Sequence, residues 1–501
     1  KNKKNKLVIG TVKTKFGHLE AASGIAGIIK VILSMQNGAI PPNLHFNNPN
    51  PNIPWDQVNL KVANELIPWK VDKLKAACVN SIGISGTIGH VILQEYRQLD
   101  NEAEIESRLP YGLLTISAKN QKAMLRMLKL YKDYFKNTDK NVLDICYTSN
   151  ISRSCLEDKI AFVGKDKNDF VLKISKYLDK FSQGKDSKID NKKVVFLFTG
   201  QGSQYKNICK ELYDTQPYFK ELLDICDKEF QKHIGESIIQ IMYNCEDEEM
   251  IYKTNYAQPI IFSIEYSLAR LWMSWGVQPT LLIGHSIGEY AAGCIAQVFS
   301  LKDAVYMVSK RGQILKDIDG KGKMLGILAN KQTVMDMIEE YKNEVSIAAV
   351  NGLNNITISG SAKAIDIIAS KAKQRRIFVE KLKISVPVHS IMLSDYVLQY
   401  KKMIHNIVFK KPKIPVFSIR SGCKADVSSI DFWSSHIVKP ISFYDEIKAA
   451  EKSGYQVFLE IGGNATLSAL GSEDYNGEAL FLPSLRNNVG CWFQLISSIR
   501  E

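Results

Sequence analysis

Residues 281–293 read Leu-Leu-Ile-Gly-His-Ser-Ile-Gly-Glu-Tyr-Ala-Ala-Gly, and this stretch decides the fold. The apolar run 281–283 predicts a buried strand and residues 289–297 predict a helix, so a G-x-S-x-G element lies at a strand–turn–helix junction. In such a junction, glycines permit a tight turn that leaves the serine hydroxyl exposed above the sheet. The sequence therefore predicts Ser286 as a nucleophile, with the N–H of Ile287 directed toward a developing oxyanion.

The composition is that of a globular protein with several domains. The chain has 501 residues, 45% of them hydrophobic and 23% charged, and that length suggests about three domains. It has no uninterrupted apolar run of the roughly 18 residues that a membrane span needs, and it does not open with a signal peptide. Its nine cysteines show no C-x-x-C spacing, which argues against a disulfide framework or a metal site. We therefore expect a cytoplasmic protein that binds no membrane.

The formal net charge of +13 favours acidic partners. The lysines are dispersed over many predicted helix faces, where most of them would simply be solvated, and no zinc finger, RNP or helix-turn-helix pattern occurs. We therefore expect no nucleic acid as a partner. A phosphorylated thioester or an acidic carrier domain fits the charge better.

The pattern of elements predicts an α/β protein in several parts. Residues 1–95 are rich in strands and glycines, and residues 96–110 are polar and acidic, as in a linker. Residues 111–190 alternate strands (112–117, 160–163) with amphipathic helices (123–135, 169–181) and end in a basic loop, 183–193. A buried strand at 194–198 begins a larger α/β domain. Within it, residues 324–383 follow the βαββαβ order of a ferredoxin-like module, which we expect to be an insertion.

A serine hydroxyl is a weak nucleophile and needs a base within hydrogen-bond reach. Three histidines follow the predicted insertion: His389, His405 and His436. His389 is the strongest candidate because it follows a strand that ends in a turn held by Pro387. A lone loop histidine is more often structural, so the residues alone do not decide its role.

Six segments between residues 194 and 490 resemble, in order, the motifs of the malonyl-CoA:acyl carrier protein transacylases. The similarity is greatest to the acyltransferase domains of modular type I polyketide synthases. The segments are Gly200-Gln201-Gly202-Ser203-Gln204, Asn255-Tyr256-Ala257-Gln258-Pro259, Gly284 to Glu289, Val386-Pro387-Val388-His389-Ser390, Trp433 to Phe443, and Phe458-Leu459-Glu460-Ile461-Gly462. Arg311 also lies where the family keeps an arginine. The resemblance implies a hydrolase-like parallel sheet with the ferredoxin-like insertion.

This resemblance implies catalysis by a serine–histidine dyad. Ser286 would attack a thioester carbonyl, and His389 would take the hydroxyl proton and return it to the leaving thiol. The backbone N–H groups of Gln201 and Ile287 would form the oxyanion hole. The family orients the imidazole with a backbone carbonyl instead of a triad aspartate, and that carbonyl maps onto His436.

The resemblance gives Arg311 the role of selecting the acyl group. A guanidinium presents a planar fork that matches a carboxylate, so a buried arginine beside an acyl-serine would select acyl groups that carry a free carboxylate. The substrate-binding set that the resemblance implies is Arg311, Gln258, His285, Val388 and Met324. Glu289 can also be explained as an acid that interacts favourably with a helix dipole.

Two positions bear on the extender unit. Ile287, after the serine, is apolar as in malonyl-type relatives, whereas methylmalonyl-type relatives often have glutamine there. Val388 stands where malonyl-type domains usually carry phenylalanine and methylmalonyl-type domains serine. A single methyl group changes binding by only about 1–3 kcal/mol, so we favour malonyl and keep methylmalonyl as the alternative.

Residues 1–95 resemble the C-terminal part of a β-ketoacyl synthase, a thiolase-like fold. The segments that carry this likeness are Thr11 to Glu20 and Asn80 to His90. Lys13 and His18 match synthase active-site positions, but the family's cysteine nucleophile would lie before residue 1, so we expect no condensation by this chain alone. Half of such a fold should expose an apolar face, covered by the rest of a longer polypeptide or by another chain.

The resemblance then divides the chain into six regions. They are a ketosynthase fragment (1–95), a ketosynthase–acyltransferase linker domain (96–190), the first part of the large acyltransferase subdomain (191–323), a ferredoxin-like subdomain (324–383), the second part of the large subdomain (384–482) and a post-acyltransferase linker (483–501).

The function that these patterns predict is transfer of a malonyl unit from malonyl-CoA, through an acyl-serine, to the phosphopantetheine thiol of an acyl carrier protein. The resemblance implies no permanently bound cofactor and no metal. The expected partners are the carrier protein and the ketosynthase part of the same or a longer polypeptide. One alternative is an α/β-hydrolase-type esterase, in which Arg311 would have no purpose. The other is a docking or structural remnant without activity.

Overall fold

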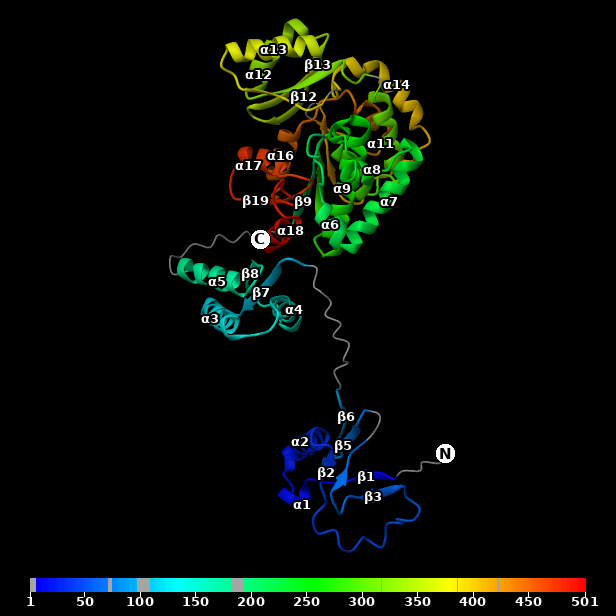
Figure 1. The fold of residues 1–501 in the computed structure, drawn as a ribbon, viewed down its shortest axis with the longest axis vertical. Coiled ribbons are helices and arrows are strands. Elements are labelled where there is room, and N and C mark those ends of the chain that lie inside the picture. The colour runs from blue at the N-terminus through cyan, green and yellow to red at the C-terminus, as the bar shows by residue number, and fades with distance from the viewer. Residues whose placement is uncertain are drawn as a thin grey trace. The chain divides into compact units, whose positions relative to one another are not determined.

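The computed structural model describes residues 6–70, 74–96, 109–181, 193–316, 318–384, 386–420 and 423–501. The chain divides into two compact units, Lys1–Glu106 and Ser107–Glu501, which are described separately (Figure 1). Most of the predicted linker 96–110 and nearly all of the predicted basic loop 183–193 lie outside the described residues.

A five-stranded parallel sheet forms the centre of the second unit. Its strands lie in the spatial order β15 (Val416–Phe417), β10 (Pro279–Gly284), β9 (Val194–Phe198), β18 (Val457–Ile461) and β19 (Leu480–Pro483). Because side chains alternate along a strand, Val195 and Leu197 enter one apolar core while Phe196 and Phe198 enter another. The sheet is therefore buried on both faces, as parallel sheets generally are.

Helices cover both faces of this sheet. The larger core contains side chains from α6 (Lys210–Thr215), α7 (Pro217–Ile234), α8 (Ile238–Tyr243), α9 (Thr254–Ser274), α10 (Gly288–Ile295), α11 (Leu301–Lys316), α14 (Ser394–Met403), α15 (Ile430–Ser435) and α18 (Cys491–Arg500). The smaller core, on the opposite face, contains side chains from α16 (Phe443–Lys452) and α17 (Thr466–Asp474). Short 3-10 turns occur at Glu248–Tyr252 and Ile391–Leu393.

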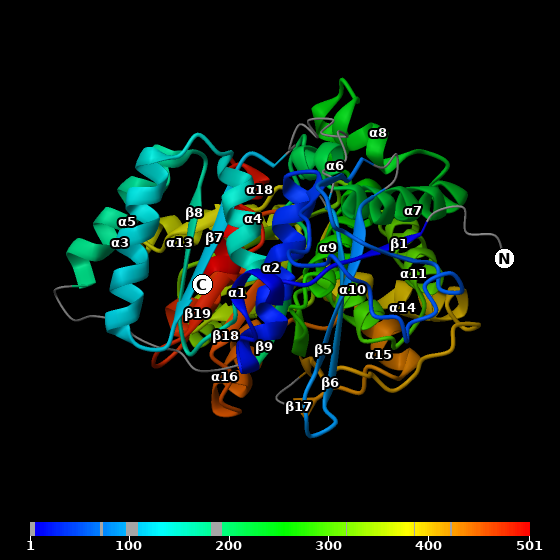
Figure 2. The same ribbon diagram turned by 90° about the horizontal axis from the view of Figure 1, so that it is seen from below.

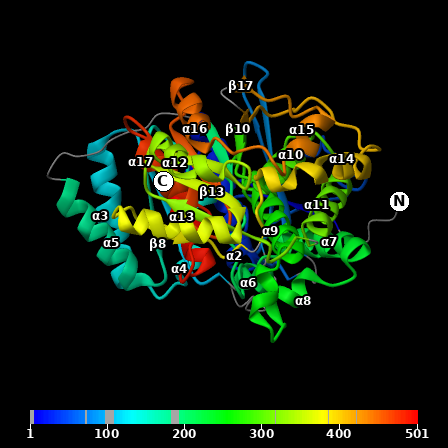
Figure 3. The same cartoon turned by 90° about the horizontal axis from the view of Figure 1, so that it is seen from above.

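A second sheet is inserted between α11 and α14. Its elements are β11 (Gly322–Ile327), α12 (Lys331–Ile338), β12 (Val345–Gly352), β13 (Asn355–Ser361), α13 (Ala362–Gln374) and β14 (Val379–Lys381), with a 3-10 turn at Glu339–Tyr341. The strands are antiparallel in the order β12-β13-β11-β14, and α12 and α13 share one core on the sheet (Figure 3). The last strand of the predicted βαββαβ module, β14, has only three residues. A parallel bridge between Ala349 and Ile441 joins this sheet to the rest of the unit.

A small α/β module precedes the central sheet. It pairs β7 (Gly112–Ala118) with β8 (Asp158–Gly164) in antiparallel register. The helices α3 (Gln121–Asn137) and α5 (Lys167–Phe181) pack beside these strands (Figure 2). A further helix, α4 (Val142–Ser152), lies against β7 and was not predicted. Asn141 caps that helix by accepting the N–H of Leu143.

The first unit is small and exposes much apolar surface. It contains β1 (Leu7–Ile9), α1 (Lys13–Phe16), a 3-10 turn (Glu20–Ala22), α2 (Ser23–Gln36), β2 (Ala39–Ile40), β3 (Leu60–Val62), β4 (Ile67–Pro68), β5 (Ala76–Ile82) and β6 (Ile88–Gln94). Phe16, Ile29 and Leu33 are 69%, 51% and 52% exposed and line an open apolar groove. Among the described helices of the chain, none combines the length and the apolar character required to cross a bilayer.

Candidate active site

The serine lies at the turn between β10 and α10, in a strained backbone conformation. Ser286 has φ = +53°, in the left-handed region that residues other than glycine rarely adopt. The glycines on both sides are required by close packing. A Cβ on Gly284 would lie 2.5 Å from the backbone of Glu289, and a Cβ on Gly288 would lie 2.5 Å from the carbonyl oxygens of Phe198 and Thr199. The turn therefore holds α10 tightly against the end of β9.

The hydroxyl of Ser286 and the imidazole of His389 are in direct contact. The Oγ–Nε2 distance is 2.7 Å, which is hydrogen-bond distance for a hydroxyl and a base. His389 also has a positive φ, +59°, and only 2% of its surface is exposed. Two residues separated by 103 positions in the chain are thus held together, both on strained backbone.

The carbonyl that orients His389 belongs to Lys439, and the expectation that it belongs to His436 was wrong. His389 Nδ1 lies 2.7 Å from the Lys439 carbonyl oxygen, while the backbone N–H of His389 donates to the Ile437 carbonyl, also at 2.7 Å. The physical reason is the turn that follows α15. The Ser435 carbonyl accepts the N–H groups of Val438 and Lys439, and this turn brings the carbonyls of 437 and 439 onto the histidine loop.

The side chain of His436 instead lies near α10, the helix after the turn that carries Ser286; this turn is called the elbow and α10 the elbow helix. Its ring stacks on Trp433, with centroids 6.2 Å apart and planes 13° apart. Its Nε2 lies 3.7 Å from Oε1 of Glu289. Glu289 is itself buried, and its Oε2 accepts the hydroxyl of Ser418 at 3.2 Å. Glu289 lies in the first turn of α10. It also belongs to a buried polar cluster with Ser418 and His436.

Two backbone N–H groups are available beside the dyad. Ile287 directly follows the serine, and Gln201 lies in the loop after β9, which packs on the elbow through Gly288. Within the described part of the chain, neither N–H donates a hydrogen bond to another protein group. Unpaired N–H groups of this kind can stabilise a negatively charged oxygen.

The guanidinium of Arg311 is buried without a partner for two of its nitrogens. Only 1% of the residue is exposed, and neither Nε nor Nη2 has a hydrogen-bond partner among the described residues. Its Cζ lies 5.9 Å from the ring centroid of Tyr290, on the elbow helix. Burial lowers the pKa of Arg311, because desolvation disfavours its charge. Buried donors without a hydrogen-bond partner are costly, and the carboxyl of Glu289 acts on Arg311 only through charge, so this arrangement favours an anionic ligand.

Gln258 and His285 both contact the loop that carries Gln201. The Gln258 amide donates to Gln201 Oε1 at 3.4 Å, and its own Oε1 has no partner among the described residues. His285 Nε2 lies 2.9 Å from Asn351 Oδ1 on β12. A Cβ on Gly200 would lie 2.8 Å from His285 Nδ1, so His285 lies between this loop and the inserted sheet.

The two apolar members of the predicted set lie together. Met324, on β11, and Val388, beside the histidine, belong to one buried cluster that also contains Leu315 and Ile437. Met324 is 5% exposed and Val388 is 4% exposed. This cluster lies where the inserted sheet meets the histidine loop.

The sequence interpretation missed two residues at this site. The carbonyl of Lys439 has no signal in the sequence, because any residue type can present a carbonyl. The buried carboxyl of Glu265 accepts both the N–H and the hydroxyl of Thr199, at 2.5 and 2.7 Å. Its spacing could have revealed it, because it lies two turns after Gln258 on the same helix, α9. Among the described residues, no group of three or more His, Cys, Asp or Glu is placed to hold a metal.

Three family models match the chain. Residues 195–496 match the acyl transferase domain. Residues 1–47 match the C-terminal domain of beta-ketoacyl synthases, and residues 49–157 match the ketoacyl-synthetase C-terminal extension.

Curated relatives and solved structures agree with these matches. Polyketide synthase GfsA of Streptomyces halstedii is 29% identical over 491 residues, and the mycoketide-CoA synthase of Mycobacterium tuberculosis is 30% identical over 470. These alignments cover 94% and 92% of this chain, which spans only 6% and 11% of the two relatives.

The acyl transferase domain of ZmaA superposes with a TM-score of 0.69 at 29% identity, covering 78% of this chain and 93% of that one. The acyltransferase domain from module 8 of the salinomycin polyketide synthase shares the fold, with a TM-score of 0.70 at 22% identity over 79% and 96% of the two chains.

Proposed function

The chain belongs to the acyl transferase family, and from that membership we propose that it transfers an extender unit in polyketide synthesis. It would take a malonyl group from malonyl-CoA onto Ser286 and pass it to the phosphopantetheine thiol of an acyl carrier protein. One observation carries the choice of substrate. A buried guanidinium, Arg311, lies beside the elbow helix with two nitrogens unpaired among the described residues, and a free carboxylate on the acyl group would pair with it.

In the first half of the reaction, the thioester carbon is attacked by Ser286 Oγ. His389 Nε2, 2.7 Å away, accepts the hydroxyl proton as the new C–O bond forms. The resulting imidazolium is stabilised through Nδ1, which donates to the Lys439 carbonyl. The N–H groups of Gln201 and Ile287 bind the oxyanion. When the tetrahedral intermediate collapses, the C–S bond breaks and His389 protonates the departing CoA thiolate.

The second half reverses these steps with a new thiol. The phosphopantetheine thiol of the carrier protein enters, His389 takes its proton, and the sulfur attacks the acyl-serine ester. The ester C–O bond breaks, and the proton returns from His389 to Ser286. No redox step occurs and no permanently bound cofactor is needed.

The apolar cluster around Met324 and Val388 is proposed to set the size of the acyl pocket. Val388 is smaller than the phenylalanine of malonyl-type relatives, whereas the apolar Ile287 resembles them. We assign malonyl as the extender and keep methylmalonyl as the competitor. The inserted sheet is assigned as the family's ferredoxin-like subdomain, on a hydrolase-like parallel sheet. The ketosynthase portion of a longer polypeptide is the proposed partner of residues 1–95.

The test is covalent labelling followed by a comparison of acyl groups. Intact-mass analysis of the chain mixed with malonyl-CoA should show one added malonyl group, and Ser286→Ala should show none. Arg311→Ala should lower malonyl transfer by about 100-fold, because a buried charge-assisted pair contributes about 2–5 kcal/mol. Acetyl transfer by Arg311→Ala should not fall.

Lys310→Ala is the matched control, because Lys310 is the neighbouring cation on α11 and is not buried. It should leave both activities unchanged. An esterase would keep its activity toward simple esters in Arg311→Ala, and a remnant without activity would take up no malonyl group. Either of these results would overturn the proposal.

A further inference from the structure

The loop between β9 and α6, residues 199–209, has no helix or strand of its own. It nevertheless carries the Gln201 N–H, which must point at one atom of the reacting thioester. An irregular loop lacks the regular backbone hydrogen bonds of a helix or strand, so these cannot determine the direction of the Gln201 N–H. The loop has bonds of its own, such as the Gly202 N–H to Gln204 Oε1 at 2.8 Å, and contacts from other elements hold this part of the loop in place.

The first of these contacts is a buried carboxyl on α9. Glu265 is fully buried, and its Oε1 accepts the N–H of Thr199 at 2.5 Å and the Thr199 hydroxyl at 2.7 Å. Thr199 is the first residue after β9 and lies two positions before Gln201. The same hydroxyl lies 3.1 Å from Ser203 Oγ, which donates to the Gly200 carbonyl at 3.1 Å. The hold of Glu265 on Thr199 thus extends across the turn that contains Gln201.

Two further residues of the same helix hold the Gln201 side chain. Its amide donates to the hydroxyl of Thr254 at 3.3 Å, and its Oε1 accepts from Gln258 at 3.4 Å. Residues 254, 258 and 265 recur at helical spacing, so they lie on one face of α9. That face contacts the loop at three points, and the contact to Thr199 is the one made to the backbone.

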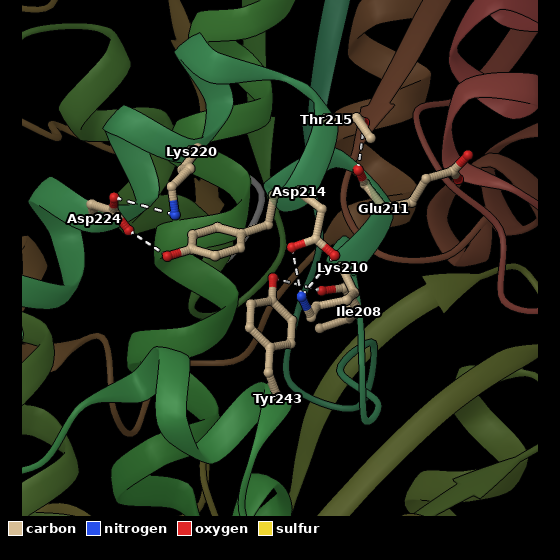
Figure 4. Close-up of polar contacts among 9 residues, drawn as sticks. Ile208, Lys210, Glu211, Asp214, Thr215, Lys220, Asp224 and Tyr243 are labelled. Carbon is tan, nitrogen blue, oxygen red and sulfur yellow. Dashed lines mark hydrogen bonds and ion pairs between the residues drawn. The ribbon is translucent and has the colours of Figure 1, made fainter. Parts of the chain in front are cut away.

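The far end of the loop has its own anchor. Tyr243, at the end of α8, donates its hydroxyl to the Ile208 carbonyl at 3.1 Å. Figure 4 shows this bond beside the paired charges of Lys210 and Asp214 on α6. The loop is therefore tied at both ends, and Glu265 ties the end that carries Gln201.

We propose that Glu265 is a positioning residue that aims the Gln201 N–H at the oxyanion by holding Thr199. This inference rests on the proposed acyl transfer. Glu265 does not touch the reacting atoms, so its effect should appear in the rate of acylation and leave substrate binding nearly unchanged.

The acceptor oxygen is the part of Glu265 that this role requires. Burial raises the pKa of Glu265 well above its ordinary value, which favours the neutral acid. Its Oε2 has no hydrogen-bond partner among the described residues. A glutamine presents the same acceptor oxygen in the same place, whereas a methionine of similar length presents none.

The experiment uses the full 501-residue chain and measures the rate of acyl-enzyme formation from malonyl-CoA. Glu265→Met should lower kcat by about 10–100-fold, because a misdirected oxyanion donor forfeits much of its contribution. Its KM should stay within about 3-fold, since ground-state contacts are retained. Glu265→Gln should keep kcat within about 3-fold of the wild-type value.

Asp227→Leu is the matched control. Asp227 is also a buried carboxyl that accepts a hydroxyl, from Ser237 at 3.0 Å, and a backbone N–H, from Ile239 at 3.3 Å, in addition to the Gln231 amide at 3.3 Å. It holds the turn before α8, and it makes no hydrogen bond to residues 199–209 in the described part of the chain. We expect this variant to lose stability and to keep its kcat.

Three results would overturn the inference while leaving the proposed function intact. They are an unchanged kcat in Glu265→Met, an equal loss in Glu265→Gln, or an equal loss in Asp227→Leu. If Glu265→Met does not fold, Thr199→Val gives the same test. It removes only the hydroxyl and should lower kcat by about 3–10-fold at constant KM. Failure of the wild type to acquire a malonyl group would instead overturn the proposed function, and this inference with it.

Discussion

At the scale of single residues, both members of the dyad lie on strained backbone, as do seven other residues with a Cβ in the described part of the chain. Ser286 and His389 have φ values of +53° and +59°. Such a conformation costs about 1–3 kcal/mol for a residue with a Cβ, and it persists only where the surroundings enforce it. Gly284 and Gly288 do so at the serine through their close packing, and the carbonyls of residues 437 and 439 do so at the histidine.

The strain at position 286 can be measured with two inactive variants. Ser286→Gly should be more stable than Ser286→Ala by about 1 kcal/mol, because glycine adopts a positive φ without steric cost. Chemical denaturation of both variants gives the difference.

Ser309 is the control for this comparison, because it is a buried serine in the middle of the helix α11. There the order should reverse, with the alanine variant more stable than the glycine variant by about 1 kcal/mol. The same order at both positions would mean that the elbow carries no strain.

At the scale of elements, the site depends on how closely α10 approaches β9. A Cβ on Gly288 would lie 2.5 Å from two backbone carbonyl oxygens at the end of β9. Backbone cannot move aside as a flexible side chain can, so the helix or the loop would have to shift. The distance between these two elements determines the positions of both the Ser286 hydroxyl and the Gln201 N–H.

Gly288→Ala should therefore destabilise the protein by about 1–3 kcal/mol and lower the acylation rate strongly. Thermal unfolding and intact-mass kinetics measure the two effects. Gly326→Ala is the control, since its Cβ would approach nothing closer than the Glu380 carbonyl at 3.7 Å. We expect Gly326→Ala to keep both its stability and its activity. A neutral effect of Gly288→Ala would contradict the close approach.

A second buried carboxyl predicts a particular pH dependence of stability. Glu460, on β18, accepts the N–H groups of Leu467 and Ser468 at the start of α17. Burial raises the pKa of Glu460 from 4.5 to about 7. Between these values, the folded state keeps a proton that the unfolded state has released. The contribution of this group to the free energy of unfolding therefore falls as pH rises, and it is constant above the folded pKa.

Glu460→Gln removes this titration. The difference in unfolding free energy between wild type and variant should fall by about 3 kcal/mol between pH 4.5 and pH 7. Denaturant titrations at a series of pH values measure it. A difference that is flat, or that rises over this window, would show that the pKa of Glu460 is not raised in the folded state.

Regular local patterns made the elements near the site predictable. The strand 194–198 and the elements around Ser286 follow from apolar runs and glycines, and the inserted strands and helices follow from their periodicity. The helix α4 was missed because its apolar residues show no clear one-sided pattern along 142–152. The orienting carbonyl was misassigned because it depends on the turn after Ser435, which only the folded chain shows.

At the scale of the whole molecule, the two units have different surfaces. Residues 107–501 bury two continuous cores on either side of a parallel sheet. The first unit exposes large apolar side chains such as Phe16, Ile29 and Leu33. Exposed apolar patches of this kind mark surfaces that another chain segment covers.

Residues 107–501 produced alone should therefore fold and keep the acylation rate of the full chain. The full chain should bind more of a hydrophobic dye than the shortened one, because the apolar surface lies in the removed unit. Circular dichroism, intact-mass kinetics and dye fluorescence test these statements. Loss of the folded state on removing residues 1–106 would show that the two units depend on each other.

The distances between site residues could not be predicted from spacing alone. The sequence names Ser286, His389 and Arg311 through a family resemblance, but the 103 positions between serine and histidine are closed only by tertiary packing. Glu265 was overlooked for a different reason. A glutamate in a long helix is usually solvated, so its spacing from Gln258 on α9 is a weak signal, which gains meaning only from its burial against Thr199.

The wide separation of the dyad has a consequence for biosynthesis. A ribosome adds about 5–20 residues per second, so Lys439, whose carbonyl orients the base, emerges roughly 8–30 s after Ser286. Throughout this interval the nascent polypeptide carries the Ser286 hydroxyl without a complete, oriented Ser286–His389 pair. We therefore expect the incomplete chain not to react with thioesters until the inserted sheet and the turn after Ser435 have been synthesised.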